Sequence, residues 1–410
     1  MTHIKKTRHD HVISANSRVV RNINRAVIFN FIRERQPISR ATIAKLARLN
    51  KSTVSNIVAS LMNEDLILEE HKANRVEARN AVGRSPINLR LKKGKNLVGA
   101  ISLDSSTTWL AIVDIDGSII VAEEVKTDIR PTDEFIVQCT QKLTAMQIQR
   151  RLPAFKGIGV TVAGIVDSAQ GKVIFAPNLG WENRELGDLI TRLCPDAGIV
   201  AVENDAKASA LAELWFGHYD INLSNFVFLS VGRGIGAGIV VDKRILSGES
   251  HLAGEFGHTV LIEGGEPCTC GNRGCWEAYA SDRATVRRYL ASKSLNQDAS
   301  TSSIDAVIGA AKGGDFIAQE EIRKTGRYLG MGIANIIKTV DPDAIIVGGH
   351  IRNAWEIIES EIMDTVRERA FLGTPGTTVI LPTSLTVRPS LLGAAAMAQG
   401  KLFSDVRVIL

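Results

Sequence analysis

Three of the five cysteines in this 410-residue chain, Cys268, Cys270 and Cys275, lie within eight positions, and His258 stands ten residues before the first of them. Thiols this close in the sequence give poor geometry for a disulfide bond. One imidazole and three thiolates are, however, the ligands of a tetrahedral zinc ion with no open coordination position. The sequence therefore predicts one structural zinc ion per chain, and the alternative is a group of three buried free thiols.

The rest of the sequence is typical of a cytoplasmic globular protein. Its length suffices for two or three domains, and 45% of its residues are hydrophobic. No apolar run reaches the ~18 residues of a membrane helix, and the amino-terminal residues contain no apolar segment of a secretory signal. We therefore expect no membrane association and a reducing environment, where clustered cysteines indicate metal binding or catalysis before disulfides.

Charge is unevenly distributed along the chain. Residues 1–95 contain 20 Lys and Arg against 7 Asp and Glu, whereas the remaining residues contain 29 against 37. A basic head on an acidic body favours a polyanionic partner for the head alone. The alternative is a solvated basic tail, and the pattern of apolar residues inside the head decides between the two.

Apolar residues at helical spacing predict three helices in this head. The first helix ends before Pro37, and its apolar face consists of Val20, Ile23, Val27, Ile28 and Phe31. The second follows Ser39, which has the residue type of an N-cap, and its inner face is formed by Ile43, Leu46 and Ala47. The third carries apolar residues at i, i+3, i+4 and i+7, namely Val54, Ile57, Val58 and Leu61.

The second and third helices predict a helix-turn-helix, and two short strands after them extend it to a winged helix over residues 1–95. The third helix turns small polar and basic groups outward to reach base edges and phosphates: Lys51, Ser52, Thr53, Ser55 and Asn56. The loop between the strands at 66–70 and 87–91 adds the arginines Arg75, Arg79 and Arg84. The alternative is a small helical dimerisation module, but the basic loop argues against it.

The body, from residue 96 onward, predicts two α/β lobes, at 96–205 and 206–410. The first begins with three strands, the second and third joined at Asp116-Gly117, a strong hairpin signal. A helix near 131–150, two further strands and a helix from about 205 follow. A second set of strand, glycine turn and strand then begins near 225. Two such lobes face each other across a cleft, where small ligands bind, and the small-residue helix near 391–400 is expected to pack back on the first lobe.

Four segments of the body resemble the ROK family (repressors, open reading frames and sugar kinases): "ENDAKASALAE", "VGRGIGAGIV", "AGEFGH" and "CTCGNRGCWEAYAS". The resemblance runs from about residue 97 to 400 and implies the two-lobed actin/hexokinase-like (ribonuclease H-like) fold. With the winged helix in front, the chain is similar to the repressor branch, which includes xylose repressors and other sugar-responsive regulators.

The resemblance also implies a sugar site. In the family, the E-x-G-H element and the glutamate after the third cysteine bind sugar, and here these are Glu255, His258 and Glu277. Asp205 matches the general base of the family's kinases, although an isolated aspartate at this position is most simply an N-cap. The last two members of the expected set are Asn178, in a loop resembling the family's sugar-side loop, and Asn204.

The phosphate-binding elements depart from the kinase pattern. ROK kinases open with Asp-x-Gly-Gly-Thr, whereas this chain has Ser106 and Thr107 in place of the two glycines. Side chains there restrict the turn and crowd a phosphate. The second loop, usually Gly-Thr-Gly, is Gly232-Arg233-Gly234. We therefore expect a sugar sensor without phosphoryl transfer rather than an enzyme.

These patterns together predict a sugar-responsive transcriptional repressor, acting as a homodimer or homotetramer. Its winged heads bind operator DNA, and a free monosaccharide releases them; resemblance favours xylose first and glucose second. Two alternatives remain open. One is an ATP-dependent sugar kinase with an added DNA-binding head, and the other is a regulator controlled by a partner protein.

Overall fold

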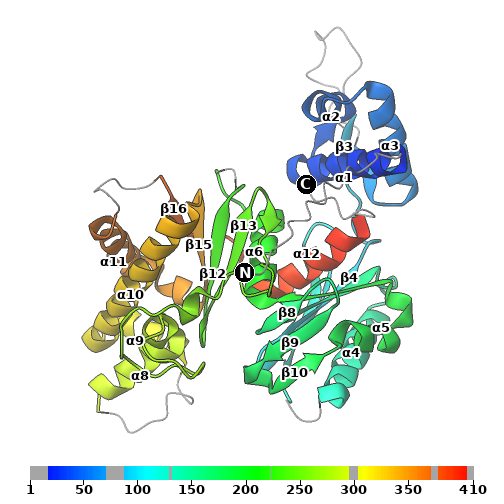
Figure 1. Cartoon of the computed structure of the whole chain (residues 1–410). Coiled ribbons are helices and arrows are strands. Elements are labelled where there is room, and N and C mark those ends of the chain that lie inside the picture. Colours follow the sequence, from blue (N-terminus) through cyan, green and yellow to red (C-terminus); the bar gives the residue numbers. More distant parts are fainter. Residues whose placement is uncertain are drawn as a thin grey trace, which may run out of the picture. The chain divides into compact units, whose positions relative to one another are not determined.

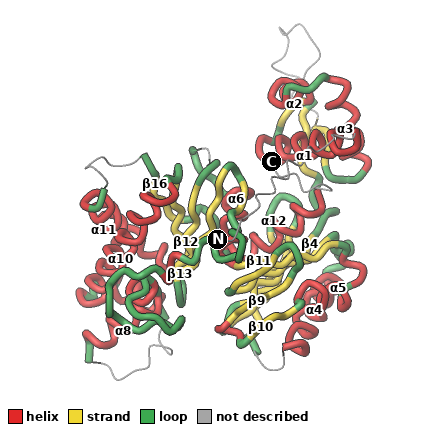
Figure 2. Tube along the Cα trace, viewed as in Figure 1, coloured by secondary structure: helices red, strands yellow, loops and turns green. Residues whose placement is uncertain are grey.

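The computed structural model describes residues 17–70, 87–128, 132–221, 223–294, 303–370 and 377–403. The chain divides into two compact units, one formed by residues 1–95 with 400–410 and the other by residues 96–399. Figure 1 labels the elements along the chain, and Figure 2 separates helices from strands. We call the first unit the head and the second unit the body.

The head contains the three helices and the two strands that the sequence predicts, together with a short third strand that it does not. Its elements are α1 (Ser17–Arg35), β1 (Ile38–Ser39), α2 (Arg40–Ala47), α3 (Lys51–Asn63), β2 (Ile67–Glu70) and β3 (Asn88–Leu91). The antiparallel strands lie in the order β1-β3-β2. Ser39 is the expected N-cap of α2, because its Oγ accepts a hydrogen bond from Thr42 N (3.1 Å). Asn50 caps α3 in the same way through Thr53 N (2.7 Å).

The core of the head agrees with the predicted inner face of α3 but not fully with those of α1 and α2. All four predicted residues of α3 are buried. Val20 and Leu46, however, are 42% and 38% exposed, so their predicted core positions are wrong. The buried residues of α1 lie on a face adjacent to the predicted one, and they are Ala26, Ile28, Phe29 and Ile32. The wing arginines Arg75, Arg79 and Arg84 lie outside the described residues.

The first lobe of the body is a five-stranded mixed sheet in the order β11-β7-β4-β5-β6. The strands are β4 (Val98–Leu103), β5 (Thr107–Val113), β6 (Ile119–Lys126), β7 (Gly157–Val162) and β11 (Ile199–Asn204). The expected Asp116-Gly117 turn joins β5 to β6 and places Gly117 at a φ of 83°. The lobe also contains α4 (Thr132–Gln149), α5 (Leu186–Leu193) and a small sheet of β8 (Ile165–Asp167), β9 (Lys172–Ala176) and β10 (Trp181–Arg184).

The second lobe repeats the strand pattern of the first, in the order β14-β13-β12-β15-β16. Its strands are β12 (Phe226–Val231), β13 (Ile235–Val241), β14 (Arg244–Ile245), β15 (Ala344–Gly349) and β16 (Val379–Pro382). Its helices are α6 (Asp205–Phe216), α7 (Glu277–Ala280), α8 (Asp282–Ser292), α9 (Ile304–Lys312), α10 (Phe316–Val340) and α11 (Trp355–Glu368). In both lobes three antiparallel strands precede two parallel ones, which is the duplicated arrangement of the actin/hexokinase-like fold.

The last helix, α12 (Pro389–Phe403), packs on the first sheet. Its backbone approaches β7 so closely that a Cβ added at Gly159 would lie 1.7 Å from the carbonyl oxygen of Ala394. Gln399 Nε2 donates to Asp114 O at 2.9 Å. The small residues of α12 therefore serve this close contact. None of the described helices is long and apolar enough to cross a membrane.

Candidate functional site

The cysteine-rich loop brings the four predicted metal ligands together. The ligand atoms of His258, Cys268, Cys270 and Cys275 all lie within 4.8 Å of one another. His258 ends the short 3-10 helix η3 (Phe256–His258), and Cys275 pairs with Val260 in an isolated β-bridge. None of these three cysteines forms a disulfide, so their thiols are free to ligate.

The distances inside the cluster match the shape of a zinc site. Zn–S bonds of about 2.3 Å, Zn–N bonds of about 2.0–2.1 Å and tetrahedral angles place two sulfur ligands about 3.8 Å apart, and a sulfur and a nitrogen about 3.6 Å apart. Cys270 Sγ lies 3.7 Å from Cys275 Sγ, and Cys268 Sγ lies 3.6 Å from His258 Nδ1. The donor set and its spacing therefore fit zinc, with Nδ1 as the ligating nitrogen of the histidine.

Glycines and one tryptophan fix the shape of this loop. Gly271 and Gly274 have φ values of 90° and 80°, and a Cβ at Gly274 would lie 1.8 Å from the carbonyl oxygen of Ile262. Trp276, directly after the last ligand, is buried and donates from Nε1 to the carbonyl of Tyr328 in α10 (2.8 Å). The loop is thus attached to the lobe through its final residues, while the predicted metal-ligating residues themselves lie in turns.

Three carboxylates from separate segments converge beside this loop. Asp205 is the first residue of α6, Asp104 follows β4, and Glu255 precedes η3. Burial raises the pKa of Asp205 to about 7, and the charges of Asp104 and Glu255 act in the same direction. A carboxyl group that titrates near neutral pH is typical of ligand-binding and catalytic sites. Both lobes contribute to this group, since Asp104 belongs to the first sheet and Glu255 to the second lobe.

Glu255, His258 and Glu277 form a continuous polar row. Glu255 Oε2 lies 3.9 Å from His258 Nε2, and Glu277 Oε1 lies 3.7 Å from His258 Nδ1. Glu277 is the most enclosed of the three, with 13% of its side chain exposed, and its Oε2 accepts from Ile235 N (3.3 Å). With Nδ1 turned to the cysteines, Nε2 is the nitrogen that faces Glu255 and remains for a ligand.

The remaining members of the predicted sugar set are placed differently. Asn204, rather than Asp205, caps α6: its Oδ1 accepts from Ala206 N (2.9 Å) and Lys207 N (3.0 Å). Its Nδ2 donates to Gly164 O at 2.9 Å, so this side chain holds the strand end in place. Asn178 is exposed on the 3-10 helix η1 (Pro177–Leu179), and no described contact joins it to the carboxylates. Trp181, in the same loop, is only 3% exposed and belongs to the core.

Lys207 is a site residue that sequence reasoning missed. It is only 3% exposed, and its Nζ donates to the carbonyl oxygens of His251 (2.8 Å) and Ser247 (3.5 Å). It therefore attaches the segment that leads to Glu255 to the first turn of α6. Burial lowers its pKa, while Glu203 and Glu255 oppose that effect. The available signal was a single charged residue in a run of alanines and serines.

The sequence pattern of the ROK family matches residues 98–401. The chain belongs to the ROK family. It is 28% identical to the xylose repressor of Caldicellulosiruptor bescii, over 95% of this chain and 98% of the other. The fold is also similar to the crystal structure of a ROK family transcriptional regulator, a homologue of the Escherichia coli MLC protein. The match covers 94% of this chain and 97% of that chain, with a TM-score of 0.78 and 27% sequence identity.

ROK kinases match a smaller part of the chain. The glucokinase of Streptomyces coelicolor is 30% identical over 73% of this chain and 97% of its own length. Regulators of the family therefore match nearly the whole chain, whereas this kinase leaves more than a quarter of it unmatched. The winged head lies outside the segment that the family pattern covers.

The first phosphate loop of the ROK kinases is a closed turn in this chain. Thr127 donates from Oγ1 to the carbonyl of Asp104 (2.7 Å) and from N to the carbonyl of Ser106 (3.1 Å). Asp104 Oδ1 in turn accepts from Ser105 N at 2.6 Å. The turn thus uses its own polar groups internally, and Ser106 and Thr107 carry side chains where the kinases have bare backbone.

An acidic group accompanies the second phosphate loop. Gly232 donates to Gly234 across the turn (2.9 Å), and Gly232 O accepts from Asp282 N (2.8 Å). Burial raises the pKa of the Asp282 carboxyl to about 8, with Asp305 adding to the effect. At neutral pH this carboxyl group is therefore mostly protonated and adds no negative charge to the loop. Sequence reasoning identified Arg233 here but not Asp282.

The recognition face of the head is accessible. Lys51, Ser52 and Asn56 of α3 are exposed, and Thr53 and Ser55 are partly exposed. Ser52 Oγ donates to Asn50 Oδ1 (2.9 Å), so it reinforces the N-cap. The predicted DNA-binding residues of α3 therefore lie together at its amino-terminal end, where the helix dipole also favours phosphate.

Proposed function

We propose that this chain is a sugar-responsive transcriptional repressor whose winged head binds operator DNA and whose body binds a free monosaccharide. The observation that carries the proposal is the combination of a head with the helices and paired strands of a winged helix and a ROK body, matched over nearly its full length by a named repressor. In the proposed complex, the amino-terminal half of α3 enters the major groove, and Lys51, Ser52, Thr53, Ser55 and Asn56 contact bases and phosphates. Arg75, Arg79 and Arg84 contact the backbone from the wing.

The proposed sugar site consists of Asp205, Glu255, His258 and Glu277, with Asn178 and Asn204 at its edge. Carboxylates accept hydrogen bonds from sugar hydroxyls, and the His258 Nε2–H donates one. The convergence of Asp104 and Glu255 on Asp205 supports an unphosphorylated ligand, because the charges of Asp104 and Glu255 repel a phosphate. Xylose is the first candidate, given the named relative, and glucose is the second.

Release of DNA then requires that sugar bind the free form of the protein more tightly than the operator-bound form, since only differential affinity shifts the equilibrium. A ligand held by residues of both lobes has that capacity when closure of the lobes alters the placement of the heads in a homodimer or homotetramer. The half-site spacing of the operator then mirrors the spacing of the heads.

Zinc is the proposed structural cofactor, one ion per chain. His258, Cys268, Cys270 and Cys275 would hold it, and the ion would supply charge and fixed geometry rather than chemistry. Its proposed role is to orient His258, so that Nε2 faces Glu255 and the sugar. His258 thus belongs to both the proposed zinc site and the proposed sugar site.

Two experiments test the sugar assignment. Operator duplexes selected from a random pool by the wild-type protein are titrated with a monosaccharide panel, and release is followed by gel shift. Glu255→Gln keeps size and leaves the predicted zinc ligands intact, but it removes the charge from one hydrogen bond. Losing a charged partner costs about 1.5–3 kcal/mol, so release should need roughly 10- to 150-fold more sugar.

Unchanged release by the same sugar in Glu255→Gln would contradict the site assignment. A panel in which no sugar binds or releases DNA would instead favour a regulator controlled by a partner protein. In both cases operator binding without sugar is the internal control, because Glu255 lies outside the head.

A further inference from the structure

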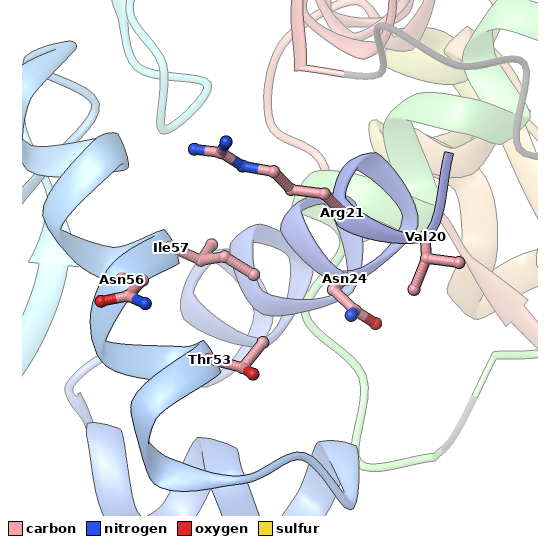
Figure 3. A pocket seen from close by; sticks show the side chains of 6 residues that line it. All are labelled: Val20, Arg21, Asn24, Thr53, Asn56 and Ile57. Carbon is pink, nitrogen blue, oxygen red and sulfur yellow. The ribbon is translucent and has the colours of Figure 1, made fainter. Parts of the chain in front are cut away.

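The head contains a pocket that the winged-helix assignment does not explain. Its volume is about 470 Å³, and it opens between α1 and α3. Its lining is Val20, Arg21, Asn24, Thr53, Asn56 and Ile57. Figure 3 shows three of these side chains coming from the start of α1 and three from α3. Apolar groups of Val20 and Ile57 thus lie beside amide, hydroxyl and guanidinium donors.

The pocket lies beside the end of α3 that is expected to meet DNA. Arg25 of α1 pairs with Glu64, directly after α3, at 2.5 Å, whereas Arg21 and Asn24 of α1 meet Thr53 and Asn56 near its beginning. The amino-terminal half of α3 therefore borders the pocket, where the helix dipole favours an anion.

Ion pairing inside the head marks the same region. Each acidic side chain described in the head has a basic partner, in the pairs Arg33–Glu34, Arg25–Glu64, Lys92–Asp65, Arg40–Glu69 and Arg90–Glu70. Arg21 and Lys51 pair with no acidic group in the part of the head that the structure describes, and the same holds for Arg35, Lys45 and Arg48. Arg21 is also exposed, so its charge is available to an external anion.

We propose that this pocket is a second DNA contact, which binds one backbone phosphate and its deoxyribose next to the groove that α3 enters. Arg21 neutralises the phosphate, Asn24 and Thr53 donate hydrogen bonds to its oxygens, and Val20 and Ile57 pack against the sugar. Such donors are the usual phosphate contacts of DNA-binding proteins, and they fix position rather than read sequence. The assignment extends the DNA interface from α3 to α1, and it rests on the proposed function.

The pocket is assigned to DNA rather than to a second copy of the head because of its charge. A pocket that joined two copies around a two-fold axis would bring Arg21 toward Arg21, and no acidic residue lines the pocket. A polyanion, in contrast, complements an exposed guanidinium beside the amino-terminal half of α3.

The test compares single variants on a mixed-sequence DNA duplex and on the selected operator, over a range of salt concentrations. Arg21→Ala should weaken binding to both duplexes by about tenfold, the lower end for losing a charged hydrogen bond. It should also lower the salt slope by about one unit, because one fewer counterion is released. Asn24→Ala should weaken binding by about 2- to 10-fold and leave the slope unchanged, because the side chain is neutral.

Arg35→Ala is the matched control. It removes the same charge from the same helix, about 21 Å from Arg21 at 1.5 Å per residue, and its guanidinium lies over the ring of Phe31. Its salt slope should equal that of the wild type. Thermal unfolding of every variant checks that the head remains folded.

Three outcomes overturn the pocket assignment. Equal losses for Arg21→Ala and Arg35→Ala would show a general charge effect. A normal slope for Arg21→Ala together with a reduced slope for Lys51→Ala would remove α1 from the interface and leave the proposed function standing. A changed oligomer mass with unchanged DNA binding would make the pocket a contact between copies. If every variant, including Lys51→Ala, binds DNA as the wild type does, the assignment of α3 as the recognition helix is itself contradicted.

Discussion

At the scale of single residues, Asp205 gives the structure a pH dependence. Its pKa rises to about 7, chiefly through burial, whereas an aspartate in an unfolded chain titrates near 3.9. Between these values the folded protein holds a proton that the unfolded chain has lost. The stability contributed by this proton is fully present below about pH 4 and is lost as the pH rises through about 7.

Asp205→Asn should therefore gain stability relative to the wild type as the pH rises from about 4 to about 7. Melting temperatures of both proteins across this range are the measurement. Asp188→Asn, an exposed change in α5, provides a control with the same loss of charge. Parallel curves for wild type and Asp205→Asn would show that the carboxyl group titrates normally.

Residue identities in the site were predicted with uneven success, for a physical reason. The cluster of His258 and the three cysteines could be predicted from the sequence because few residue types bind zinc and their spacing is short. The hydrogen bonds of Asn204 could not be, because an asparagine before a helix fits a cap and a ligand equally well. Lys207 and Asp282 act through burial, which depends on packing that a single sequence does not reveal.

At the scale of elements, the metal loop carries the sharpest prediction. Between η3 and α7 the loop contains turns and two isolated β-bridges, so its ligands have little other support. Cys270→Ser should lose most of the bound zinc, whereas the wild type should hold about one equivalent per chain. Because 1 kcal/mol shifts melting by about 2–4 °C in a large domain, a loss of a few kcal/mol should lower the melting temperature by about 5–10 °C.

Cys194→Ser is the control, because Cys194 is a free cysteine outside the cluster. It should keep its zinc and its melting temperature. Metal analysis by mass spectrometry and thermal unfolding decide the question together. A wild-type protein purified without chelator that contains less than about half an equivalent of zinc would refute the assignment.

Most elements were predictable because local patterns and packing agree. The three helices of the head, the hairpin at Asp116-Gly117 and the second strand set near residue 225 all form as expected. The core face of α1 was not, since Val20 continues the apolar spacing but lines an open pocket beside α3 and stays exposed, whereas Ile28 and Ile32 are buried. Apolar periodicity alone does not show which residues of a helix a neighbouring element covers.

At the scale of the whole molecule, the altered phosphate loops of the two lobes predict that the protein binds sugar without transferring a phosphoryl group. No ADP should form from ATP with any hexose or pentose that releases the operator. The reasons are the side chains of Ser106 and Thr107 in the first phosphate turn and that of Arg233 in the second loop. A coupled assay for ADP measures this, and sugar-dependent turnover would establish the kinase alternative instead.

The closed turn at Asp104–Thr107 has a consequence for how such a regulator reports on the cell. A kinase consumes its sugar, so its output depends on elapsed time and on a second nucleotide substrate. A receptor that only binds leaves the sugar pool intact, and its occupancy depends on concentration alone, rising from about one tenth to nine tenths over roughly two decades around Kd for a single site. On the proposed function, the response to sugar is therefore reversible and consumes no nucleotide.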